Sequence, residues 1–132
     1  MDVPLVRVEC RLKATSVAAR EARQALGPLA DHVGEEVFDD VRLLVTELVT
    51  NSLRHASLGD GEAIELAAEV RHRTLRVEVR DAGTSFNPPS TPGAREGDDG
   101  WGLYLLGRIA DRWGINCDPS TCVWFEMDIE KP

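Results

Sequence analysis

The chain has 132 residues, of which 42% are hydrophobic and 29% charged, and its formal net charge is -8. This length fits one globular domain, expected over residues 1–132, and the acidic balance argues against a nucleic-acid partner because few cations remain to neutralise phosphates. No apolar run approaches the roughly 20 residues that span a bilayer, and the amino terminus lacks the apolar core of a signal peptide. We therefore expect a cytoplasmic protein with no membrane partner and with reduced cysteines.

Residue periodicity predicts four strands and three helices along the chain. In chain order they are a strand at 5–12, a helix at 15–30, a helix at 35–55, a hairpin of strands at 64–70 and 75–80, a helix at 101–113 and a strand at 123–129. Residues 82–100 have no periodicity and are expected to form a long loop. Thr15 or Ser16 would cap the first helix, Gly27-Pro28 would mark its end, and Gly114 would end the last helix.

The expected strands share one property that predicts the fold class. Each has an apolar and a polar face, whereas strands of an all-parallel α/β sheet are apolar on both faces. We therefore expect a two-layer α/β (α+β) sandwich, in which helices cover one face of a mixed, mostly antiparallel sheet.

Glu47 and Asn51 form the first candidate site. They lie four residues apart in the expected helix 35–55, so their side chains point the same way, one turn apart. They flank the apolar stripe of this helix, which consists of Val37, Val41, Leu44, Val45 and Leu48. A carboxylate and an amide oxygen beside a buried face suit a hard cation and acid–base chemistry, although a solvated helix flank has the same pattern.

Two glycine motifs follow. Asp81-Ala82-Gly83 stands where a strand ends, where a carboxylate can accept a hydrogen bond from an amine and glycine permits close approach. Gly100-Trp101-Gly102-Leu103 opens the helix expected at 101–113, where free backbone amides favour an anion such as phosphate. Either motif alone is also typical of an ordinary turn or helix start.

The order of these motifs resembles the ATP-binding domain shared by gyrase-type topoisomerases, heat-shock chaperones, sensor histidine kinases and mismatch-repair ATPases (the GHKL or histidine kinase-like superfamily, with the Bergerat fold). The segments Ala110-Asp111-Arg112-Trp113-Gly114 and Val123-Trp124-Phe125-Glu126 resemble the bacterial anti-sigma-factor serine/threonine kinases within it. No Gly-x4-Gly-Lys-Ser/Thr pattern is present, so a Walker-type site is not expected.

The resemblance implies a role for each motif. Glu47 would be the catalytic general base, and Asn51 would coordinate Mg²⁺ bridging the ATP phosphates. Asp81 would accept a hydrogen bond from the adenine amine, and residues 84–99 would form a lid over the nucleotide. The implied nucleotide-binding positions are Asn51, Asp81, Gly83, Gly100, Gly102, Leu103 and Thr121.

The sequence differs from the family pattern at three places. Ser85 replaces a second glycine that often follows Asp-x-Gly. Asp98 and Asp99 stand before Gly-x-Gly, where a basic residue is common, and carboxylates repel a triphosphate unless they point away or meet a cation. Either Thr121 or Cys122 could take the place of an adenine-contacting threonine.

The resemblance implies an ATP-dependent serine/threonine kinase that acts as an anti-sigma factor. Its partners would be a sigma factor and an anti-anti-sigma (STAS-type) protein, its cofactors ATP and Mg²⁺, and its assembly a homodimer. Ser85, Asp98 and Asp99 favour a second hypothesis, a non-catalytic module that binds its partner in response to ATP. The catalytic domain of a two-component histidine kinase and an α/β domain that binds no nucleotide are two further hypotheses.

Overall fold

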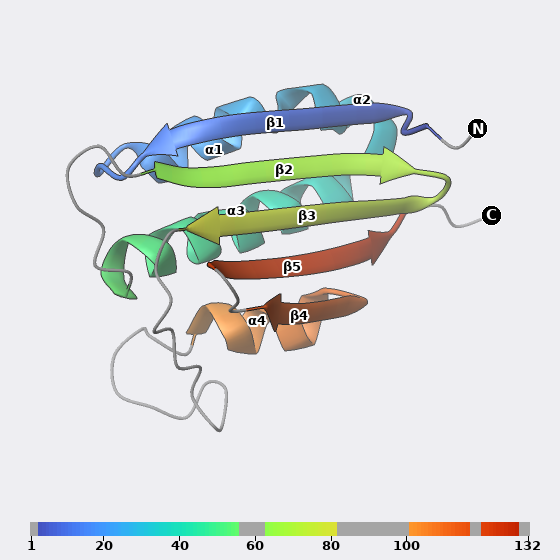
Figure 1. The fold of residues 1–132 in the computed structure, drawn as a ribbon. Helices are drawn as coiled ribbons and strands as arrows, with labels where there is room; N and C mark the ends of the chain where they lie inside the picture. The colour runs from blue at the N-terminus through green and yellow to red at the C-terminus, as the bar shows by residue number, and fades with distance from the viewer. Residues whose placement is uncertain (1–2, 56–62, 82–100, 117–119, 130–132) are drawn as a thin grey trace.

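The computed structural model describes residues 3–55, 63–81, 101–116 and 120–129. These residues form two layers, a five-stranded sheet and a layer of helices on one of its faces (Figure 1). None of the described helices has the length and hydropathy needed to cross a bilayer.

The sheet has the order β1-β2-β3-β5-β4, and each of its pairs is antiparallel. Its strands are β1 (Val6–Lys13), β2 (Ala63–Arg71), β3 (Thr74–Asp81), β4 (Arg112–Asn116) and β5 (Thr121–Asp128). A tight turn joins β2 to β3, and His72 in this turn has a φ of 59°. The sequence-based prediction of a mostly antiparallel sheet with helices on one face is thus confirmed.

The helical layer begins with a broken segment. Its elements are α1 (Ala18–Ala25), the short 3-10 helix η1 (Gly27–Leu29), α2 (Ala30–Val33), α3 (Glu35–His55) and α4 (Trp101–Ile109). The bounds of α3 agree with the prediction. The helix end expected at Gly27-Pro28 is also found, since α1 ends at Ala25 and η1 begins at Gly27. Pro28 has no backbone N–H to donate and cannot continue an α-helix. Val17 is the residue at the amino-terminal cap of α1, and the Thr15 hydroxyl accepts its N–H at 3.3 Å.

The prediction of a helix extending to Trp113 is wrong. α4 ends at Ile109, and Trp113 lies in the edge strand β4 opposite Phe125. Gly114 therefore does not end a helix but faces Trp124, whose indole atoms lie 2.8–2.9 Å from where a Cβ of residue 114 would be. Tertiary pairing with β5 outweighs the helical spacing of this segment.

The core lies between the two layers. It contains the apolar row of each strand, for example Leu75, Val77 and Val79 of β3, and the predicted stripe of α3 apart from Val37, which is half-buried. The alternation read from the sequence therefore matches the burial of the strands.

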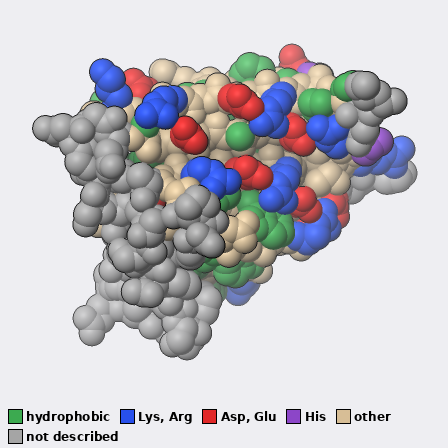
Figure 2. Space-filling view, viewed as in Figure 1, with side chains coloured by type: hydrophobic (Ala, Val, Ile, Leu, Met, Phe, Trp, Pro, Cys, Tyr) green, Lys and Arg blue, Asp and Glu red, His purple; other side chains and the backbone are tan. Residues whose placement is uncertain are grey.

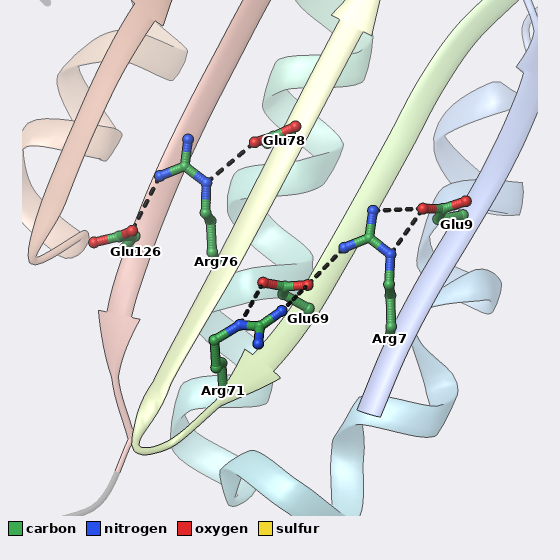
Figure 3. Close-up of polar contacts among 7 residues, drawn as sticks. All are labelled: Arg7, Glu9, Glu69, Arg71, Arg76, Glu78 and Glu126. Carbon is green, nitrogen blue, oxygen red and sulfur yellow. Dashed lines mark hydrogen bonds and ion pairs between the residues drawn. The ribbon is translucent and has the colours of Figure 1, made fainter. Parts of the chain in front are cut away.

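The other face of the sheet is open and charged, with blue and red side chains interleaved in Figure 2. One row crosses all five strands with alternating charge, and we call it the charge ladder: Arg7, Glu69, Arg76, Glu126 and Arg112. Its ion pairs measure 2.6 Å for Arg7–Glu69, 3.0 Å for Arg76–Glu126 and 2.8 Å for Arg112–Glu126 (Figure 3 shows the first two). The Arg76 guanidinium also lies 4.4 Å from the ring centre of Trp124.

Candidate nucleotide site

Glu47 and Asn51 lie near the carboxyl-terminal end of α3. The helix packs its apolar stripe on the sheet, and Leu48 between the two polar residues is buried. Glu47 is half-buried, whereas Asn51 is only 6% exposed, so the amide lies deeper than a helix flank. A buried amide needs polar partners, which makes Asn51 a better candidate for a binding residue than a solvated side chain would be.

The second position of α4 lies against this pair. A Cβ placed on Gly102 would be 2.7 Å from Nδ2 of Asn51 and 3.4 Å from Cβ of Glu47. Gly102 itself is buried, and Leu103 beside it is 2% exposed in the core. The fold thus brings the Gly-x-Gly motif to the Glu47–Asn51 pair, although about 50 residues separate them in sequence.

Asp81 and Thr121 form a second polar pair. They are direct partners across β3 and β5, and they are 7% and 3% exposed. Asp81 continues the inward row of Leu75, Val77 and Val79, so its side chain belongs to the face that the helices cover. By the same alternation Thr121 shares this face and Cys122 belongs to the open one, opposite Arg80. Of Thr121 and Cys122, only Thr121 therefore faces the same layer as Asp81.

The buried polar side chains of the described residues are Asn51, Asp81 and Thr121. All three are site residues predicted from the sequence. The end of β3, the start of β5 and the last turns of α3 lie at the same end of the molecule (Figure 1). Gly83, Ser85, Asp98, Asp99, Gly100 and the predicted lid at 84–99 lie outside the described residues.

The donor set at this end of the molecule fits a nucleotide with a hard cation. The Asn51 oxygen is the kind of ligand that Mg²⁺ accepts, alongside phosphate oxygens and water. The backbone N–H of Gly102 lies in the first turn of α4, where the helix itself supplies no acceptor. Within the described ranges, no three His, Cys, Asp or Glu side chains cluster as a metal site.

Sequence reasoning missed two contacts around the site. The first is the direct packing of Gly102 on Asn51, which depends on how α3 and α4 cross and has no local signal. The second joins the ends of β3 and β5 from the open face, where Nη1 of Arg80 donates to the Ser120 hydroxyl at 3.3 Å. The alternation of Arg80 with Val79 and Asp81 predicted its outward direction but not its partner.

In comparisons with known proteins, the matching family model and the similar relatives indicate the same class of protein. A family model described as "Histidine kinase-like ATPase domain" matches residues 11–127. Serine-protein kinase RsbW of Listeria innocua is 33% identical over 116 residues, covering 76% of this chain and 73% of the relative. Serine-protein kinase RsbW of Listeria monocytogenes serotype 4a is 30% identical with the same coverage. Anti-sigma F factor of Clostridium acetobutylicum is 30% identical over 79 residues, covering 58% of this chain and 55% of the relative.

Proposed function

The chain belongs to the histidine kinase-like ATPase family, and from this premise we propose that it is an ATP-dependent protein serine/threonine kinase and anti-sigma factor. The observation that carries the proposal is the identity of the buried polar side chains: Asn51, Asp81 and Thr121 lie at one end of the sheet. A few polar groups gathered beside apolar side chains are typical of a ligand site, where they fix the orientation of the ligand.

Phosphoryl transfer needs positioned donors, a metal clamp and an oriented nucleophile. Asn51 would hold Mg²⁺ through its amide oxygen, and the cation would neutralise charge on the ATP phosphates. The first-turn amides of α4, including that of Gly102, would donate to phosphate oxygens. Asp81 would accept a hydrogen bond from the adenine amine, with Thr121 beside it. Leu103 would line the apolar side of the nucleotide site.

Glu47 would serve as the general base. It lies one turn from Asn51, and its Cβ is 3.4 Å from where a Cβ of residue 102 would be, so a serine or threonine hydroxyl reaching the γ-phosphate would meet its carboxylate. Glu47 would take the hydroxyl proton as the hydroxyl oxygen bonds to the γ-phosphorus and the bond to the ADP oxygen breaks. Among these proposed roles, only that of Glu47 requires an acceptor protein. The roles of the other residues require ATP and Mg²⁺ alone.

The proposed partners are a sigma factor, which the protein would sequester, and an anti-anti-sigma protein of the STAS type, which it would phosphorylate. The name anti-sigma F factor of one relative supports the sigma-factor partner, and the name serine-protein kinase RsbW of another supports a serine as the phosphate acceptor.

We also propose that the protein acts as a homodimer. Equilibrium sedimentation should then give twice the 14.5 kDa chain mass, and the mass of one chain at tens of micromolar would contradict this assembly.

The test of kinase function is transfer of labelled phosphate from ATP to an anti-anti-sigma protein of the same organism. Glu47→Gln should lower the transfer rate by about 100- to 10,000-fold, because the base is lost, with ATP affinity largely kept. Glu36→Gln, at an exposed position on the same helix, is the matched control and should transfer normally.

Each outcome of this test has a distinct meaning. Transfer by Glu47→Gln at the wild-type rate would exclude Glu47 as the base. ATP binding by the wild-type protein without transfer to any partner of that organism would favour a non-catalytic, ATP-dependent binding module.

A further inference from the structure

Gly102 is required by its surroundings and not by its backbone conformation. It lies inside α4, where any residue can adopt the helical φ and ψ. A Cβ at this position would nevertheless be 2.7 Å from Nδ2 of Asn51, closer than real Cβ contacts come. Position 102 therefore has room for hydrogen alone while the Asn51 amide keeps its place.

We propose that Gly102 is a positioning residue, which sets the orientation of the Asn51 amide for the cation. The amide nitrogen is the Asn51 atom nearest to position 102, so the nitrogen end of the planar group faces α4. The oxygen end is the only part of this side chain that can bind a cation. Close packing of α4 on the nitrogen end thus leaves the oxygen end for the metal. This inference rests on the proposed function, since it assigns Mg²⁺ to Asn51.

The nature of the contact predicts what a methyl group at 102 would do. Nδ2 is the far end of a flexible side chain, so the amide can turn away at small cost to the fold. At Gly114 the corresponding atoms belong to the Trp124 indole, a rigid ring that also contacts the Arg76 guanidinium, so relief of a clash there costs more. We therefore expect Gly102→Ala to fold and to lose the position of the metal ligand.

The experiment measures ATP affinity by calorimetry with Mg²⁺ and again with EDTA. The ratio of the affinity with Mg²⁺ to the affinity with EDTA, which we call the magnesium ratio, measures the contribution of the cation to ATP binding. Gly102→Ala should lower this ratio by about tenfold or more, because loss of a group that orients a metal ligand has an effect of this size. The affinity for ATP without metal should change little, because the backbone N–H of residue 102 remains. Gly107→Ala is the control in the same helix, since among the described residues a Cβ there would meet only Trp113 Nε1 at 4.0 Å.

A double-variant comparison separates positioning from a general structural effect. In the Asn51→Ala background, Gly102→Ala should have no further effect on the magnesium ratio, because the group that it displaces is gone.

Two results would overturn the inference. They are a wild-type magnesium ratio in Gly102→Ala and additive losses of that ratio in the double variant. In both, ATP binding by the wild-type protein would keep the proposed function intact. Absence of ATP binding by the wild-type protein would overturn both.

Discussion

At the scale of single residues, three buried polar groups distinguish the site from the core around it. Asn51 lies on α3, whereas Asp81 and Thr121 end the inward rows of β3 and β5. Burial of such groups is stable only where they form hydrogen bonds, and the loss of one bond costs about 1–3 kcal/mol. A nucleotide bound at this end of the molecule would offer polar atoms to all three side chains.

Asp81→Asn tests the proposed adenine contact. The substitution keeps the size of the side chain but removes the charge that strengthens a hydrogen bond from the adenine amine, so ATP affinity should fall by about 10- to 100-fold. Calorimetry with Mg-ATP measures this change. Asp39→Asn, at an exposed position of α3, serves as the control. Equal affinities for the two variants would remove Asp81 from the site.

At the scale of elements, the edge strand β4 depends on one glycine. Gly114 lies under the Trp124 indole, and a Cβ there would approach three ring atoms at 2.8–2.9 Å. Gly114→Ala should therefore lower the free energy of unfolding by about 1–3 kcal/mol, as overpacking does. Urea unfolding measures this loss. Gly107→Ala should instead be neutral or stabilising by up to about 1 kcal/mol, because alanine favours a helix interior. A Gly114→Ala protein as stable as the wild type would contradict this packing.

The elements also show how far sequence alone could predict the molecule. The strands β1, β2, β3 and β5 and the helix α3 followed from periodicity, because each has one face in the core. β4 could not be predicted, since Ile109, Ala110 and Trp113 keep helical spacing and only pairing with β5 makes the segment a strand. The same limit applies to the site: motif order suggested Asn51 and Gly102 separately, whereas their contact depends on the packing of α3 on α4.

At the scale of the whole molecule, the open face of the sheet predicts a pH dependence. In Glu126, hydrogen bonds from Arg112 and then Arg76 lower the pKa despite partial burial. In Glu69, burial acts to raise the pKa, but the hydrogen bonds from Arg71 and Arg7 outweigh it and the pKa is lowered. Both carboxylates therefore bind protons less readily in the folded than in the unfolded protein, and the charge ladder contributes most stability at neutral pH.

The sign of the effect follows from linkage. The contribution of these glutamates should be complete above their unfolded pKa of about 4.3 and be lost as the pH falls through their lower folded values. Glu126→Gln should therefore flatten the fall of unfolding free energy between neutral and acid pH, as measured by urea titrations. Glu65→Gln, which removes an exposed pair with Arg11, should leave that slope nearly unchanged. Identical slopes for both variants and the wild type would show that the charge ladder is not the source of this pH dependence.

Binding of Mg-ATP to the purified chain, followed by calorimetry, tests the central claim most directly. We predict saturable binding with one ATP per chain and a dissociation constant below about 1 mM, within the usual range of Michaelis constants. Mg-GTP should bind more weakly, because it offers a carbonyl oxygen to Asp81 in place of the adenine amine. Absence of binding at millimolar Mg-ATP would contradict the assignment of a nucleotide site to this chain.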